Sequence, residues 1–289
     1  MKADRFYSLG SILLVFICHV TLVGKPRVVV SIPPQKAFVQ ALIGTEVEIL
    51  TLIKPGQNPT NFSLTPRTMA EIARSDVYFS IGVPFEEAIL PKLRAIYPEL
   101  KFVDTSTGIR KRGLQSHSHE EEKGPHDHAA DPHIWLSPGL VKVQLRSYVR
   151  SLKELLPERA DFINENLAVF LAKQDAVDAQ LKEILGAHTR ATVFVYHPAF
   201  GYFLERYGLR QETVEQEGKQ PSPKQLRSLI ELAKEFDART IFVQPQFERH
   251  AAQTLAKAIG GKVEIIDPLA ENYLDNLLLM GETIANSHH

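Results

Sequence analysis

Short apolar runs alternate with segments of helical periodicity along most of the chain. In the first half, buried strands are predicted at 27–32, 47–53, 76–82 and 101–105. Helices are predicted between them, at AFVQALIG, at TPRTMAEIARS and from Glu86 to Ile96. Short runs rich in β-branched residues are typical of buried strands, and strands that alternate with helices form parallel βαβ units. The first half therefore predicts a small parallel sheet flanked by helices.

The second half repeats this alternation. Strands are predicted at ATVFVYHP, RTIFVQP and KVEIIDP, and helices at AFGYFLERYG, SPKQLRSLIELAKEF, HAAQTLAKAIGG and YLDNLLLMGETIA. Pro198 near the start of one helix and Gly208 at its end are common helix boundary residues. A second small parallel sheet with its own helices is therefore expected.

A long helical tract lies between the two halves. Ser137 and Pro138 predict an N-cap and a first-turn proline, and Pro157 predicts a break. After Pro157, apolar residues recur every three or four positions, with one polar exception, at Ile163, Leu167, Phe170, Gln174, Val177, Leu181 and Ile184. A helix from about 158 to 185 spans roughly 40 Å. It is either an ordinary crossover helix or, as its length and position favour, a backbone that limits hinge motion between two lobes.

These patterns predict an α/β fold of two lobes, each with a small parallel sheet flanked by helices, joined by a long rigid linking helix. The expected divisions are a signal peptide (1–24), an N-terminal lobe (25–136) with a His-rich loop (115–130), linking helices (137–187) and a C-terminal lobe (188–289). Two lobes of this size can each bury a core.

The N-terminus is typical of an export signal. Lys2 and Arg5 precede an apolar stretch from Leu9 to Val23, which is short for a bilayer span. We expect cleavage near Gly24; an uncleaved anchor is the alternative. Cys18 follows VFI, which lacks the small residue expected before a lipid-modified cysteine. The protein is therefore expected in the periplasm or otherwise exported, and the sequence leaves membrane tethering open.

Composition narrows the chemistry further. Cys18 is the only cysteine, so the exported chain has neither a disulfide nor a thiolate ligand, and a metal site must use His, Asp, Glu or neutral oxygens. The formal net charge of -1 gives no basic footprint for a nucleic acid. We expect no nucleic-acid partner.

Three side chains are candidates for a divalent metal site. His197 and Asp267 follow predicted strands, and His133 precedes the long helical tract. Ligands of open parallel sheets bind beyond the carboxyl ends of the strands, and two imidazoles with a carboxylate suit a transition metal. Taken singly, each has a structural alternative: His197 as a helix cap, Asp267 as a turn residue, and His133 as a partner of nearby backbone.

Four further histidines lie just before His133 in a polar tract without apolar periodicity: His117, His119, His126 and His128. Imidazoles beside carboxylates can bind metal weakly, so accessory capture of metal is one interpretation. A tolerated polar insertion is the other.

Five segments carry a resemblance to a known family. DPHIWLSP (131–138) and VYHPAFGYFLERYGL (195–209) are its most specific motifs, and KQPSPKQL, IFVQPQF and DPLAENYLDNL support them. In these segments the chain resembles the metal-binding solute-binding proteins of bacterial zinc and manganese ABC transporters. The resemblance implies a cleft between two lobes and metal ligands at His133, His197 and Asp267. Histidine at position 197 is typical of zinc-type members, so Zn²⁺ is expected, with Mn²⁺ or another divalent metal as the alternative.

One position departs from the family pattern. In GQNPTNFSLTP (56–66), Thr60 stands where the resemblance implies a first-lobe histidine ligand, and Asn58 replaces an acidic residue. A neutral hydroxyl is a weak zinc ligand. Water, a histidine from the preceding tract, weak binding, another metal or a chelated metal all remain open for this position.

The resemblance implies high-affinity capture of a divalent metal, most readily zinc, and its delivery by a monomer to an ABC permease, without enzymatic chemistry. A degenerate binding protein or metallochaperone is one alternative. The other is a zinc hydrolase with an open His133, His197 and Asp267 site, which would need a general base, for which Glu215 and Glu217 are candidates.

Overall fold

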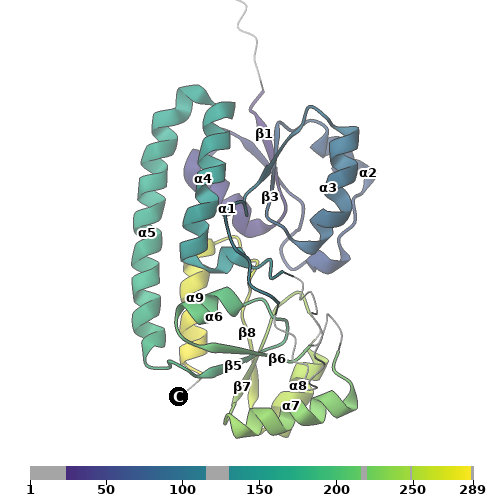
Figure 1. Cartoon of the computed structure of the whole chain (residues 1–289), viewed down its shortest axis with the longest axis vertical. Helices are drawn as coiled ribbons and strands as arrows, with labels where there is room; N and C mark the ends of the chain where they lie inside the picture. The colour runs from purple at the N-terminus through teal and green to yellow at the C-terminus, as the bar shows by residue number, and fades with distance from the viewer. Residues whose placement is uncertain (1–23, 115–129, 216–219, 248, 288–289) are drawn as a thin grey trace, which may run out of the picture.

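The protein consists of two α/β lobes stacked along its longest axis, with one long helix beside both (Figure 1). A computed structural model describes residues 24–114, 130–215, 220–247 and 249–287. The predicted fold class is confirmed. Within these residues, no helix is both long enough and apolar enough to span a membrane.

The N-terminal lobe contains a parallel four-stranded sheet in the order β2-β1-β3-β4. Its strands are β1 (Arg27–Val30), β2 (Glu48–Thr51), β3 (Val77–Ser80) and β4 (Lys101–Asp104). The connecting helices are α1 (Pro33–Ile43), α2 (Pro66–Ile72) and α3 (Pro84–Ile96), with a short 3-10 turn, η1 (Pro59–Asn61), after β2. A proline near the start of each helix lacks the N–H that would otherwise have no intrahelical partner at that position.

The C-terminal lobe repeats this topology in the order β6-β5-β7-β8. Its strands are β5 (Thr192–Val195), β6 (Arg210–Thr213), β7 (Thr240–Val243) and β8 (Lys262–Ile265). Its helices are α6 (Gly201–Arg206), α7 (Pro223–Glu235), α8 (His250–Ala258) and α9 (Tyr273–Ala285). The apolar pattern does not predict β6, because its residues RQET carry no apolar run.

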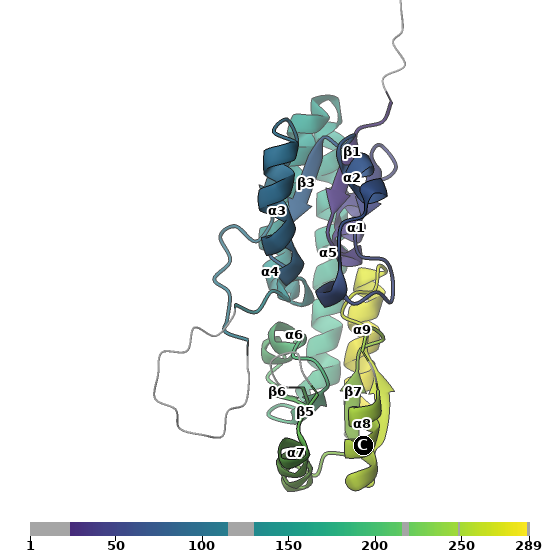
Figure 2. The same cartoon turned by 90° about the vertical axis from the view of Figure 1, so that its right-hand side faces the viewer.

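Two helices and two 3-10 turns connect the lobes: η2 (Ile134–Leu136), α4 (Pro138–Leu155), η3 (Pro157–Arg159) and α5 (Ala160–Gly186). The predicted break at Pro157 is confirmed. Ser137 is the N-cap residue of α4 and Pro138 lies in its first turn, as predicted, although the Ser137 side chain makes no capping hydrogen bond. Figure 2 shows α5 behind both lobes, and it packs against α1, α4 and α9.

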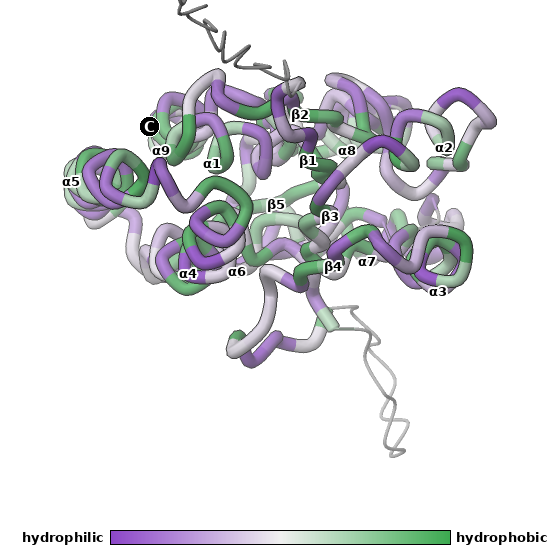
Figure 3. The backbone as a smooth tube through the Cα atoms, turned by 90° about the horizontal axis from the view of Figure 1, so that it is seen from above, coloured by the Kyte–Doolittle hydropathy of each residue, from purple (hydrophilic) through white to green (hydrophobic). Residues whose placement is uncertain are grey.

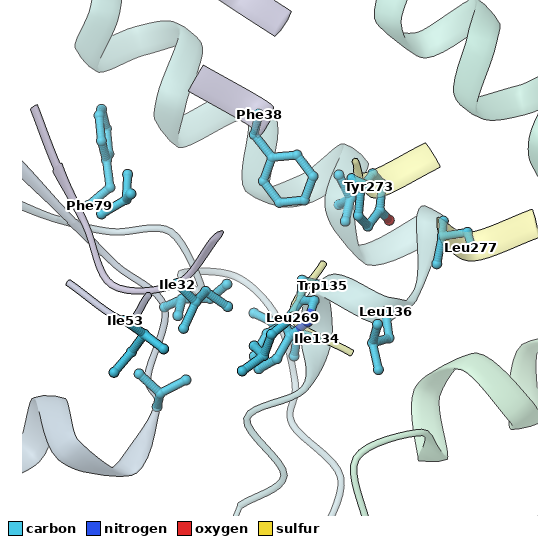
Figure 4. Packing of buried hydrophobic residues seen from close by; sticks show 14 of the residues in the cluster. Ile32, Phe38, Ile53, Phe79, Ile134, Trp135, Leu136, Leu269, Tyr273 and Leu277 are labelled. Atoms are coloured by element: carbon cyan, nitrogen blue, oxygen red, sulfur yellow. The ribbon is translucent and has the colours of Figure 1, made fainter. Parts of the chain in front are cut away.

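One hydrophobic core extends across the junction of the lobes. The Phe38 ring of α1 meets Phe170 of α5 at a centroid distance of 6.2 Å and Tyr273 of α9 at 4.8 Å. Trp135 and Leu269 lie in the same region (Figure 4), and the Trp135 indole N–H donates to the Pro268 carbonyl at 2.7 Å. Viewed from above, α5 presents both apolar and polar residues around its axis (Figure 3), as expected for a helix with one buried face.

Candidate functional site

A cavity of about 120 Å³ lies between the lobes, beyond the carboxyl ends of both sheets. Its first wall comes from the loop after β2, at 58–60, and the turn after β3, at 83–84. Its second wall comes from loops that follow β5, β7 and β8. The segment that passes between the lobes adds residues on both sides of the His-rich tract, including His133 and Trp135. This is where open parallel sheets bind ligands.

His133 lines the cavity and is held by a buried carboxylate. Its side-chain Nδ1 lies 2.7 Å from Asp131 Oδ1, and its backbone N–H donates to the same oxygen at 3.0 Å. Asp131 is 1% exposed. Because a carboxylate accepts, Nδ1 carries the proton and Nε2 keeps its lone pair. Burial lowers the pKa of His133, partly opposed by the hydrogen bond to Asp131, and this favours the neutral ring that metal binding needs.

His197 lies across the cavity and is held in a similar way. Its Nδ1 is 2.6 Å from Oε1 of Glu215, a buried residue just after β6. Gln244 fixes the backbone of His197, donating to its carbonyl at 2.8 Å and accepting from its N–H at 3.3 Å. Phe247 stacks on the imidazole with a centroid distance of 4.8 Å and an interplanar angle of 22°. The ring therefore has one orientation, with Nε2 left for a ligand.

The two imidazoles face each other. Their ring centroids are 5.3 Å apart with an interplanar angle of 75°. Zinc binds imidazole nitrogen at about 2.0–2.1 Å, so one ion can bridge two rings at this separation. The two carboxylates behind the rings supply two negative charges that offset a dication. The residues therefore fit a divalent metal ligated by His133 and His197.

Asp267 lies beside the cavity rather than in its lining. Its Oδ1 accepts from Gln246 Nε2 at 2.8 Å and from the Leu269 N–H at 2.9 Å, which is the turn role that the sequence also allowed. Within residues 24–114, 130–215, 220–247 and 249–287, no group of three His, Cys, Asp or Glu side chains is placed to hold a metal. Ligation by Asp267 stays a prediction.

Thr60 lines the first wall as the sequence suggested, in η1. Its backbone N–H and its hydroxyl both donate to Asn58 Oδ1, at 2.9 and 2.8 Å. This wall thus offers neutral oxygen and nitrogen atoms, without an imidazole or a carboxylate. His117, His119, His126 and His128 lie outside the described residues, and their role in capture stays a prediction.

Sequence reasoning missed three residues that position the imidazoles. Asp131 had a local signal, because it stands two residues before His133 in DPH. Glu215 was considered as a base for an attacking water, whereas the structure commits its carboxylate to His197. Gln244 stands in the motif IFVQPQF, and its amide holds the His197 backbone. No sequence signal connects Glu215 or Gln244 to position 197; the sheet brings them together.

Comparison with known proteins identifies a family for the chain. A family model described as zinc-uptake complex component A, periplasmic, matches residues 28–287. The chain is 25% identical over 263 residues to a putative metal-binding protein of Chlamydia muridarum, covering 91% of each. It is 27% identical over 256 residues to the high-affinity zinc uptake system protein ZnuA of Bacillus subtilis, covering 85% of this chain and 79% of that protein. A crystal structure of ZnuA superposes with a TM-score of 0.85 at 34% identity, covering 92% of this chain and all of the other.

Proposed function

The chain belongs to the family of periplasmic zinc-uptake complex components, and from its interlobe site we propose that it captures zinc with high affinity for import by an ABC permease. The family consists of solute-binding proteins rather than enzymes. Capture needs only deprotonated ligands and reversible affinity, since no bond in the cargo is made or broken.

One observation carries this proposal. His133 and His197 face each other across the cavity, and a buried carboxylate holds the Nδ1 of each ring. Both Nε2 lone pairs are therefore left for one ion. Imidazole pairs suit zinc, whereas manganese prefers a site richer in oxygen. Asp267 is the proposed third ligand, through the oxygen that does not bind Gln246 and Leu269.

Delivery to a permease follows from the family and from the place of the site. The cavity opens between two lobes, so a partner that docks across both could take the ion up as the lobes separate. We propose capture outside the cytoplasmic membrane, by a monomer whose first 24 residues are an export signal.

The neutral first wall favours one competing function. Thr60 and Asn58 offer weak donors, so the chain could hold metal loosely as a degenerate binding protein or metallochaperone. The hydrolase alternative loses one of its two candidate bases, because the Glu215 carboxylate lies on His197 Nδ1 instead of facing a water position. The other, Glu217, lies outside the described residues.

Competitive zinc titration of the chain without residues 1–24 tests the proposal. We compare wild type, the double variant His133→Ala with His197→Ala, a deletion of residues 117–128, and a control, His250→Ala, at an exposed position on α8. One tightly bound zinc is expected in wild type, in the control and in the deletion, and its loss is expected in the double variant. Weak binding in wild type would favour the metallochaperone. Tight binding that survives the double variant but not the deletion would move the function to the His-rich tract.

A further inference from the structure

The cavity supplies fewer strong metal ligands than a closed zinc site uses. Two imidazoles line it, whereas Asp267 lies outside its lining with one carboxylate oxygen already accepting two hydrogen bonds. A structural zinc site takes four protein ligands in a tetrahedron, and a site with fewer keeps its open positions for exogenous ligands. At least one position, and two if Asp267 stays in its turn, is open here.

The open side faces the first wall. The side chains there are Asn58 and Thr60, which hydrogen-bond to each other, and the apolar Pro59, Val83 and Pro84. Neutral amide and hydroxyl groups bind metal weakly but hydrogen-bond well to a carboxylate or an amine. The wall is therefore better suited to contact a ligand of the metal than the metal itself.

The volume and the character of the lining favour an organic ligand over water. A cavity of about 120 Å³ exceeds what one ion fills, and a single water needs only about 10–15 Å³ of such space together with two to four polar partners. Much of the lining is apolar, including Val83, Phe247 and Leu269. An ordered water cluster would lack partners there, whereas the carbon atoms of a small chelator would pack against these side chains.

Charge limits which chelator fits. The described lining contains no Lys, Arg, Asp or Glu side chain. The Asp131 and Glu215 carboxylates behind the imidazoles already offset the two positive charges of the ion. A polyanionic chelator would bring further negative charge into a cavity whose described lining has no cationic side chain to receive it, at a high desolvation cost. A ligand of low net charge avoids this cost.

We propose that the cavity takes its divalent metal as a complex with one small chelator of the α-amino-acid class. The inference rests on the proposed function and names its cargo more closely. The amine and carboxylate of the chelator occupy the open positions on the metal. The carboxylate also accepts a hydrogen bond from the side-chain NH2 of Asn58, since the Thr60 hydroxyl and N–H already donate to the Asn58 oxygen. The side chain of the chelator lies against the apolar lining.

Equilibrium dialysis with zinc and radiolabelled L-histidine tests the proposal on the chain without residues 1–24. Zinc alone and zinc with labelled citrate are the parallel mixtures. Label retained by the His133→Ala, His197→Ala double variant comes from elsewhere on the chain and is subtracted. Two variants probe the wall: Thr60→His, which places an imidazole in the open position, and Thr60→Ser, which keeps the hydroxyl and the space.

Wild type and Thr60→Ser are expected to retain about one L-histidine per zinc and little citrate, whereas Thr60→His keeps zinc and retains roughly tenfold less L-histidine. Zinc bound tightly by wild type without label would overturn the co-ligand and leave the proposed function intact. Equal retention of citrate, or unchanged L-histidine in Thr60→His, would also overturn it. If wild type binds zinc in none of the mixtures, the proposed function itself is contradicted.

Discussion

Individual carboxylates determine what the two histidines can do. Asp131 and Glu215 are 1% and 4% exposed, and each accepts from one imidazole Nδ1. A carboxylate in this position fixes the tautomer and the orientation of the ring and raises its basicity toward a metal. The affinity of the site should therefore depend on residues that never touch the ion.

Replacing Glu215 with Gln tests this dependence. The amide oxygen can still accept from His197 Nδ1, but its negative charge is lost and the amide can flip. Zinc affinity should fall by about 10–100-fold while the fold persists. Competitive zinc titration and circular dichroism measure both. Glu231→Gln, at an exposed position of α7, is the matched control and should bind as wild type does. Equal zinc affinity of the two variants would show that Glu215 does not support metal binding by His197.

A third buried carboxylate, Glu86, makes stability depend on pH. Glu86, in the first turn of α3, accepts hydrogen bonds from Ser31 Oγ and from the N–H groups of Ile81 and Gly82. Burial raises the pKa of Glu86 to about 7, although these hydrogen bonds oppose the shift. This residue holds the turn that carries Val83 and Pro84 to the cavity wall.

The direction of the pH effect follows from that shift. Because the folded state binds the proton more tightly than the unfolded state, the contribution of Glu86 to the free energy of unfolding falls from about pH 4.5 to about pH 7. Glu86→Gln should remove this fall. The free energy of unfolding of the variant, relative to that of wild type, should therefore increase by up to about 3 kcal/mol from acidic to alkaline pH. Urea unfolding across the range measures it. Glu87→Gln, at the exposed neighbouring position, should keep the wild-type profile, and an unchanged profile in Glu86→Gln would refute the assignment.

Some of these residues could be identified from the sequence and others could not. His133 and His197 follow from motif positions, and both line the cavity. Glu215 and Gln244 are 18 and 47 residues from His197 and reach it only because β5 pairs with β6 and β7. Side-chain pairing across a sheet depends on register, which a local apolar pattern does not contain.

At the scale of elements, apolar periodicity predicted most strands and all the long helices. β6 was missed because its buried residues are polar. Gln211, for instance, accepts from the Phe200 N–H at 2.8 Å. Its partner strand and this tertiary hydrogen bond stabilise β6, so propensity alone does not reveal it. The long helix α5 was predicted within two residues at each end, because its stripe extends over many turns.

One buried ion pair attaches α5 to the C-terminal lobe. Asp178, with a side chain 8% exposed, binds Arg206 of α6 through two hydrogen bonds of 2.6 and 2.7 Å and accepts from the Tyr207 hydroxyl at 3.0 Å. Burial raises the pKa of Asp178, but the hydrogen bonds from Arg206, Lys182 and Tyr207 outweigh it and hold the pKa well below its usual range. This contribution to stability is present at neutral pH and is lost as the pH falls toward the folded-state pKa.

Asp178→Asn should therefore destabilise the protein. The substitution leaves Arg206 partly buried without its counter-charge, a loss of about 3 kcal/mol in the free energy of unfolding. Urea unfolding at neutral pH measures it. Asp175→Asn, on the same helix and paired with Lys142 at the surface, should cost less than about 1 kcal/mol. The gap between the variants should narrow in acid. Equal costs for the two would show that the buried pair does not fasten α5 to α6.

At the scale of the whole molecule, several contacts hold the lobes together. The helix α5 packs on α1 of one lobe and α9 of the other. The Phe38 and Tyr273 rings meet between them, and Lys36 pairs with Glu271 at 2.6 Å. The division of the chain into lobes at 136/137 and 187/188 stays a prediction, because one hydrophobic core continues across the junction of the lobes. The monomeric state also stays a prediction. We expect such a backbone to permit only small changes in the angle between the lobes.

The chain contains a single tryptophan, and its position beside the site should make its fluorescence sensitive to metal binding. The ring centroids of Trp135 and His133 are 5.2 Å apart, and the indole N–H donates to the Pro268 carbonyl in the opposite lobe. Zinc should therefore change the intrinsic fluorescence saturably, because a dication beside His133 alters the field on the indole. Small-angle scattering should show a change in radius of gyration below about 1 Å, since α5 resists a wide hinge. The His133→Ala, His197→Ala double variant should keep its fluorescence constant. A large contraction on binding zinc would show that α5 bends, and a constant signal in wild type would place the ion away from His133.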